Sequence, residues 1–117
     1  METKSAVGSL SALAHEGRLS AFRLLIQAGA DGLAAGEIAR RLDVLPNTLS
    51  ASLTILSHAG LITSRRNGRS IIYRANYGAM RQLLAFLMED CCGGKPEICA
   101  PLTAIASQCC EAEGRCA

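Results

Sequence analysis

The residues of this sequence best suited to chemistry are its six cysteines, because a thiolate is both a nucleophile and a ligand for soft metal ions. All six lie after residue 90, and none occurs before it. Cysteines that merely fill a core would be scattered among the apolar positions of the whole chain. Their segregation therefore predicts a C-terminal segment that binds a ligand. The cysteines form two groups, Cys91, Cys92 and Cys99, and then Cys109, Cys110 and Cys116.

The first group has a spacing that could surround a single ion. Neighbouring residues on a helix point about 100° apart, so Cys91 and Cys92 can meet at one ion only where the backbone leaves the helical conformation. Gly93-Gly94 and Pro96 provide such a departure and bring Cys99 back toward the pair. Three converging thiolates suit the pyramidal coordination of As(III) or Sb(III), whereas hard, oxygen-seeking ions prefer other ligands. We therefore predict As(III) or Sb(III) as an effector, and no catalytic cofactor.

The second group repeats the pattern of a cysteine pair followed by a third cysteine. It could form a second arsenical site, supply thiols to the first group, or act as an ion-catching tail. The stretch from Cys109 to Arg115 also fits the Cys-x5-Arg oxyanion loop of phosphatases. That loop needs small residues whose amides face an anion, whereas this one contains Glu111 and Glu113, so we do not predict a phosphatase.

Structural zinc is the main alternative to arsenic at these cysteines. Zinc normally takes four ligands, commonly from Cys-x2-Cys knuckles, and the sequence has no such knuckle. His15 and His58 each stand alone and receive no ligand role. On this alternative the C-terminal cysteines would hold zinc permanently, and the protein would act constitutively.

A thiol oxidoreductase or arsenate reductase is a further alternative from the enzyme class. The sequence shows no nucleotide-binding loop, no paired carboxylates, and no nucleophile with a base and an orienting group. We therefore expect no catalytic site.

Charge is unevenly distributed along the chain, although the formal net charge is only +2. Between Val44 and Met88 there is no Asp or Glu, while five arginines lie in this stretch. A uniformly basic region of this kind is expected on a surface that meets nucleic-acid phosphates.

Hydropathy bears on the cellular compartment. No apolar run approaches the roughly 20 residues that a membrane span needs, and residues 1–10 lack the basic and apolar segments of a secretion signal. We therefore expect a cytoplasmic protein without membrane contact. In that compartment thiols stay reduced and free to bind an ion.

Apolar spacing and turn residues predict the elements that position these groups. Two helices, separated near Gly17, are predicted for the first part of the chain, and the second should end at Gly29. A short helix from Ala35 to Leu42 and a longer one from Pro46 to Ala59 follow. The longer helix begins with a proline, which is tolerated in a first turn because its missing N–H would have no partner there.

Two strands and a last helix complete the predicted domain. Leu61 to Arg66 and Arg69 to Ala75 are predicted strands joined by Asn67-Gly68, a pair that accepts the positive φ angles of a tight hairpin. A fifth helix follows, with an apolar stripe wider than a small core requires, so we expect it to pair with a second copy of the chain. The stripe consists of Met80, Leu83, Leu84, Leu87 and Met88.

The predicted fourth helix has an outer face of small, uncharged residues opposite Leu49, Leu53 and Leu56. A solvated helix would carry Lys and Glu there, so this face is suited to entering a DNA major groove. The hairpin that follows could place arginines on phosphates or in the adjacent minor groove. The predicted DNA-binding residues are Asn47, Thr48, Ser50, Ala51, Ser52 and Thr54 of the helix and Arg65, Arg66 and Arg69 of the hairpin.

The predicted fold is mainly α with a small β-hairpin, in the order α-α-α-α-β-β-α, which is a winged helix-turn-helix. Residues 1–90 would form a DNA-binding and dimerisation domain, and residues 91–117 a cysteine-rich, ligand-binding tail. The expected partners are double-stranded operator DNA and a second copy of the chain in a homodimer.

Four stretches of the chain resemble the ArsR/SmtB family of metal-sensing repressors. They are Leu13–Leu19, Leu49–Leu53, Leu56–Ile62 and the hairpin from Arg66 to Tyr73. The resemblance implies a homodimer joined by the first and fifth helices. It also implies that the dimer binds a palindromic operator without its ligand and dissociates when the ligand binds.

Two departures from the family pattern move the predicted sensing site to the C-terminal cysteines. Many arsenic sensors of this family carry Cys-x-Cys at the start of the third helix, where this sequence has Leu33–Gly36 without a cysteine. The acids and histidines of zinc sensors are missing along the fifth helix. The segment Cys91–Cys99 is similar to one at the end of the fifth helix in an arsenite-sensing branch, which implies that its three cysteines are ligands.

Overall fold

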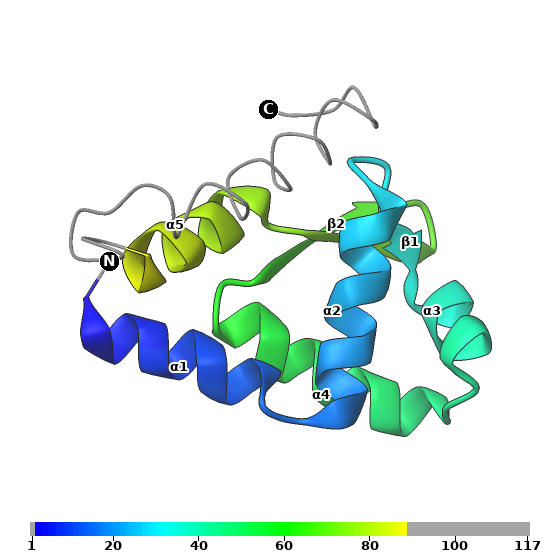
Figure 1. The fold of residues 1–117 in the computed structure, drawn as a ribbon. Helices are drawn as coiled ribbons and strands as arrows, with labels where there is room; N and C mark the ends of the chain where they lie inside the picture. Colours follow the sequence, from blue (N-terminus) through cyan, green and yellow to red (C-terminus); the bar gives the residue numbers. More distant parts are fainter. Residues whose placement is uncertain (1, 89–117) are drawn as a thin grey trace. The chain divides into compact units, whose positions relative to one another are not determined.

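A computed structural model describes residues 2–88 of the chain (Figure 1). The chain divides into two compact units, residues 1–84 and 85–117. The elements described below belong to the first unit, except for the end of the last helix. The predicted domain boundary at residue 90 and all six cysteines lie outside the described residues, so these predictions stay open.

The first two helices are α1, Thr3–Leu13, and α2, Glu16–Ala28. They separate at Ala14 and His15, so the predicted break near Gly17 falls a few residues late. The reason is the His15 ring, whose Nδ1 accepts hydrogen bonds from the backbone N–H groups of Gly17 and Arg18 at 3.1 and 3.4 Å. His15 therefore caps the N-terminus of α2, because those N–H groups have no partner within the helix.

The next two helices are α3, Ala35–Leu42, and α4, Pro46–His58, and their bounds agree closely with the prediction. The turn between them contains Asp43 in the left-handed conformation, with φ of 54°. The N–H of Val44 donates to the carbonyl of Ala39 at 3.1 Å, and that of Asp43 donates to Arg40 at 3.3 Å. This pairing is a Schellman motif, which ends α3 and orients the start of α4.

A three-stranded antiparallel sheet accompanies the helices, with the order β1-β3-β2. Its strands are β1, Leu33–Ala34, β2, Ile62–Asn67, and β3, Ser70–Ala75. Strand β1 was not predicted, because two residues are too few to show a strand pattern. It is held by pairing with Tyr73 and Ile72 of β3.

The hairpin turn differs from the prediction by one residue. Asn67 pairs with Ser70 in the β2–β3 ladder, so the two-residue loop consists of Gly68 and Arg69 rather than Asn67 and Gly68. Gly68 has a φ of 64° and Arg69 has no positive φ. This is the pattern of a type II′ turn, which needs glycine only at its first central position.

The core lies where α2, α3, α4 and the sheet meet. Its largest fully buried side chains are apolar residues from each of these helices and from the loop that leads into β2. They are Phe22, Leu25, Ile38, Leu53, Leu56 and Leu61.

The last described helix is α5, Tyr77–Leu87. Its N-terminus is capped by Asn76, whose Oδ1 accepts from the N–H of Ala79 at 3.2 Å and whose Nδ2 donates to the carbonyl of Gly60 at 3.0 Å. Of its apolar stripe, Leu83 is buried, whereas Leu84 and Leu87 are exposed. Within residues 2–88 no helix combines the length and the apolar character that crossing a membrane requires.

Candidate nucleic-acid interface

Helix α4 is held in place at both ends by the turns that flank it. At its start, the Asp43 turn described above leads into Leu45, whose carbonyl accepts from the N–H of Leu49 at 3.0 Å. At its end, Gly60 has a φ of 79° and the N–H of the buried residue Leu61 donates to the carbonyl of Leu56 at 3.1 Å. This second Schellman motif fixes where the chain turns from α4 into the hairpin.

The face of α4 that points away from the core carries most of the predicted base-contacting residues. The exposed predicted residues of α4 are Asn47, Thr48, Ser50, Ala51 and Thr54. None of them is charged. The hydroxyl of Thr54 donates to the carbonyl of Ser50 at 2.9 Å, so these two residues are linked along the helix surface.

Ser52 does not belong to this exposed face, and its predicted placement there is wrong. Its side chain is only 9% exposed, because the spacing from Leu49 through Ser52 and Leu53 to Leu56 puts it in the buried stripe. Ile55 is exposed instead. The prediction assigned Ser52 to the outer face because it is polar, but its position in the helical repeat of α4 decides that it faces the core.

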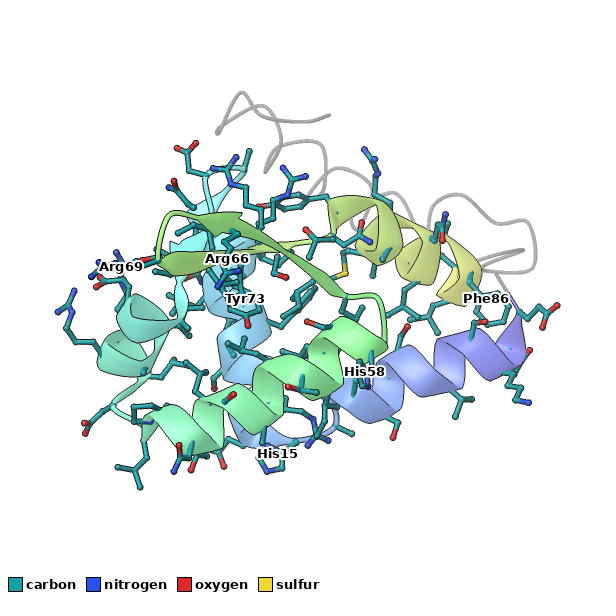
Figure 2. All side chains as sticks on the ribbon, turned by 180° about the vertical axis from the view of Figure 1, so that it is seen from behind. His15, His58, Arg66, Arg69, Tyr73 and Phe86 are labelled. Carbon is teal, nitrogen blue, oxygen red and sulfur yellow. The ribbon has the colours of Figure 1, made fainter. Side chains whose placement is uncertain are left out.

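The β2–β3 hairpin presents arginines on both of its faces. Arg66 is paired with Ile71 and Arg65 with Ile72, so the side chains of the two consecutive arginines lie on opposite sides of the ladder. Arg65, Arg66 and Arg69 are all exposed. Figure 2 shows Arg66 and Arg69 on the hairpin and His58 at the C-terminal end of α4.

One face of the hairpin is slightly hollowed and contains Arg74, which is not among the predicted DNA-binding residues. The pocket has a volume of about 140 Å³ and is lined by Thr63, Ser64, Arg65, Ile72 and Arg74. The Nε of Arg74 donates to the hydroxyl of Thr63 at 3.3 Å. Strand alternation could have identified Arg74, since Thr63 and Arg74 are paired across the ladder two positions from Arg65.

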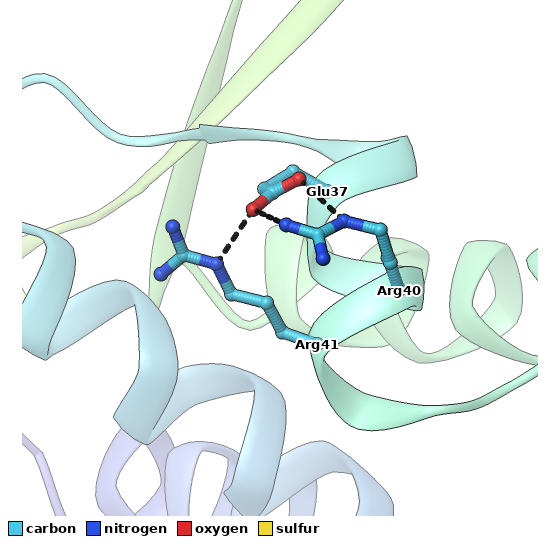
Figure 3. Close-up of polar contacts among 3 residues, drawn as sticks. All are labelled: Glu37, Arg40 and Arg41. Atoms are coloured by element: carbon cyan, nitrogen blue, oxygen red, sulfur yellow. Dashed lines mark hydrogen bonds and ion pairs between the residues drawn. The ribbon is translucent and has the colours of Figure 1, made fainter.

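Helix α3 carries a second basic group, in which Glu37 bridges Arg40 and Arg41 (Figure 3). The Nε of Arg40 donates to Oε2 of Glu37 at 3.0 Å, and that of Arg41 donates to Oε1 at 2.8 Å. These hydrogen bonds lower the pKa of Glu37 from 4.5 to about 2, and the carboxylate raises the pKa of Arg40. The three side chains together carry one net positive charge beside the turn into α4.

The described residues offer no obvious metal site. In the part of the chain from residue 2 to residue 88, no three Cys, His, Asp or Glu side chains gather closely enough to hold an ion. The predicted ligands Cys91, Cys92 and Cys99, and the second group Cys109, Cys110 and Cys116, fall outside that part. Their role stays a prediction.

Comparison with known proteins identifies the architecture. Residues 13–65 match a family model described as a helix-turn-helix domain. A biofilm growth-associated repressor from Agrobacterium fabrum is 32% identical over 83 residues, which cover 71% of this chain and 68% of that protein. A putative arsenical resistance operon repressor, ArsR, from Halobacterium salinarum is 44% identical over 63 residues, or 54% of this chain. This chain belongs to the ArsR family of transcriptional regulators. It spans about half the length of the Halobacterium protein, 48%.

Solved structures similar to this ArsR-family chain include a winged helix-turn-helix domain. HlyU from Vibrio cholerae is 32% identical, with a TM-score of 0.59 over 74% of this chain and 97% of that one. The homodimeric winged helix-turn-helix DNA-binding domain of a possible ArsR-family regulator from Mycobacterium bovis is 28% identical, with a TM-score of 0.57 over 74% and 83% of the two chains. The predicted fold class is confirmed. The relatives are transcriptional regulators and not enzymes, in agreement with the prediction of no catalytic role.

Proposed function

We propose that this ArsR-family chain represses transcription by binding operator DNA as a homodimer, and that As(III) or Sb(III) releases it by binding to the C-terminal cysteine thiolates. The observation that carries the DNA-binding part is the uncharged exposed face of α4 beside a hairpin rich in arginine. No acidic residue lies between Val44 and Met88, so nothing within this stretch opposes the approach of phosphates.

On this proposal α4 enters the major groove and the hairpin acts as the wing. Asn47, Thr48, Ser50, Ala51 and Thr54 are short enough to let the helix sit close to the base edges. Arg65, Arg66 and Arg69 contact phosphates or the adjacent minor groove and make binding depend on salt. Ser52 contributes through the fold and not through the DNA, since its side chain is buried.

The homodimer is supported by apolar side chains that this single chain leaves exposed. Val7 and Leu10 of α1 are exposed, and so is Leu84 of α5. Apolar residues exposed at helical spacing are typical of an interface between copies. The domain from Mycobacterium bovis is homodimeric, and a dimer of this chain would present two α4 helices to successive major grooves about 34 Å apart.

The effector part of the proposal rests on ligand chemistry and on one relative. Thiolates are the protein ligands best suited to trivalent arsenic and antimony. The Halobacterium protein is named as an arsenical resistance operon repressor, and 54% of this chain aligns with it. We place this chemistry in the cytoplasm, where cysteines stay reduced.

Release requires only a modest coupling between the two sites. Ion capture by Cys91, Cys92 and Cys99, which follow α5 in sequence, would alter the end of that helix and so the separation of the two DNA-reading heads. A hundredfold loss of DNA affinity corresponds to a coupling free energy of about 2.7 kcal/mol. The coupling is reciprocal, so operator DNA must weaken ion binding by the same factor.

The test begins by selecting a binding sequence for the reduced, full-length protein from a pool of random duplex DNA. Its affinity for the enriched operator is then measured by fluorescence anisotropy with and without As(III) or Sb(III). The wild type should lose DNA affinity about a hundredfold when the ion is added. A variant with Cys91, Cys92 and Cys99 changed to Ser should bind the operator normally but keep it in the presence of the ion.

The second cysteine group supplies the matched control. A variant with Cys109, Cys110 and Cys116 changed to Ser should still release DNA, and the opposite pattern would move the site to this group. A wild type that holds its operator at saturating As(III) and Sb(III) would refute the effector part alone. Zinc bound to the purified protein, found by native mass spectrometry, together with that outcome would favour the constitutive regulator.

A further inference from the structure

The most exposed large apolar side chain among residues 2–88 lies at the start of α4. Leu45, the N-cap residue of that helix, is 73% exposed. Its neighbour Val44 is partly buried and packs against the core, so the chain crosses from interior to solvent between these two residues. The exposure of Leu45 is therefore a property of a defined position and not of a loose chain end.

The backbone at Leu45 is held in one conformation by its neighbours. Its φ and ψ are −68° and 142°, the extended region to which a residue before proline is restricted. Its carbonyl accepts the first hydrogen bond of α4, from Leu49. The Schellman motif at Asp43 fixes the chain on the other side. The backbone at this leucine therefore has little conformational freedom left to lose on binding, and the ordering cost is confined to the side-chain rotamers.

We propose that Leu45 reads the 5-methyl group of a thymine in the major groove of the operator. This inference rests on the proposed function, since it assumes that α4 is the recognition helix. The N-terminal residues of a recognition helix are those that reach the base edges. The thymine methyl is the one apolar group that a base presents there, and an aliphatic side chain is its natural contact.

The surroundings of Leu45 favour this occupant over a protein partner. Asn47 and Thr48, which follow it on the helix, are exposed and uncharged, and Arg40 and Arg41 of α3 lie just before the turn. An apolar residue among hydrogen-bonding groups and cations matches a thymine methyl set among base edges and phosphates. The apolar residues that suit a second copy, Val7 and Leu10, lie on α1.

The inference can be tested by removing the methyl group from the DNA alone. Each thymine of the selected operator is replaced in turn by deoxyuridine, symmetrically in both half-sites, and the affinity of the wild type and of Leu45→Ala is measured. At one position the wild type should lose about fourfold in affinity per half-site, the effect of one buried methyl group. Leu45→Ala should bind the thymine operator more weakly and show no loss on that replacement.

A matched control is available in Leu19→Ala, which truncates an exposed leucine on α2. This variant should keep the full effect of deoxyuridine. Because Leu45 is exposed, its truncation should leave the urea unfolding midpoint unchanged, which separates a lost contact from a lost fold. Equal deoxyuridine effects in the wild type and Leu45→Ala, or none in either, would overturn the inference while operator binding stands. Failure to enrich any duplex would instead overturn the proposed function.

Discussion

The hydroxyl of Tyr77 donates a hydrogen bond to the carbonyl oxygen of Ile26 at 2.9 Å, joining residues 51 positions apart. Ile26 lies in the last turn of α2, where the backbone carbonyl groups find no N–H donor within the helix. Tyr77 is the first residue of α5. The bond therefore satisfies an otherwise unpaired carbonyl and ties the start of α5 to the domain that holds α4.

Replacing Tyr77 with Phe should lower the free energy of unfolding by about 1 kcal/mol, because the carbonyl of Ile26 loses this partner in a partly buried place. Urea unfolding followed by circular dichroism would measure the loss. Tyr73→Phe is the control, since no hydrogen bond is described for the hydroxyl of Tyr73 within residues 2–88. Equal losses in the two variants would show that the bond contributes nothing specific.

Two glycines should respond differently to the same substitution. Gly60 has a φ of 79° but open space where a Cβ would stand, so Gly60→Ala should cost only the backbone strain, about 1 kcal/mol. A Cβ at Gly32 would overlap the carbonyl oxygen of Tyr73, a backbone atom that cannot rotate away. Gly32→Ala should therefore cost more, on the order of 3 kcal/mol. Thermal or urea unfolding would rank the two, and a reversed order would contradict the close packing of β1 on β3.

The stability contributed by Glu37 should depend on pH in an acidic window. Its pKa is about 2 in the folded protein and 4.5 as a free side chain, so folding favours the ionised form. The contribution should be complete above pH 4.5 and should fall as the pH drops toward 2. Unfolding free energies of the wild type and Glu37→Gln should differ at pH 6, and the difference should narrow steadily on acidification until little is left near pH 2. The difference should also shrink with added salt, because its partners Arg40 and Arg41 are exposed. A difference that grows on acidification would contradict the assigned pairing with Arg40 and Arg41.

Operator binding should become less dependent on salt when a wing arginine is removed. Each phosphate contact contributes about 0.9 to the slope of log affinity against log salt concentration. In a homodimer, Arg66→Ala or Arg69→Ala removes two such contacts, so the slope should fall by about 1.8. Arg23→Ala, which removes an exposed arginine of α2, is the charge-matched control and should leave the slope nearly unchanged. Equal changes in all three variants would indicate a general charge effect and no wing contact.

Local sequence patterns were enough to predict the elements that carry the candidate interface. The bounds of α3 and the start of α4 follow from helical spacing, from Pro46 and from the turn residues around Asp43, all of which act within a few residues. The hairpin was predicted for the same reason, although the loop lies one residue later because Gly68 alone supplies the positive φ that the turn needs. Such preferences act through the backbone of neighbouring residues and need no distant partner.

Tertiary structure decided what local patterns could not. The burial of Ser52 depends on where α4 meets the core, and the strand at Leu33 exists only because β3 lies beside it. The pairing of Tyr77 with Ile26 and the exposure of Leu45 likewise depend on how distant segments pack. The sequence by itself determined the order of elements, the basic stretch and the clustering of cysteines. Composition and short-range conformational preference depend only on the identity of each residue and of its immediate neighbours in the chain. Which side chains face the core and which face a partner was settled only when those elements packed together, since burial is a property of contacts between residues far apart in the chain.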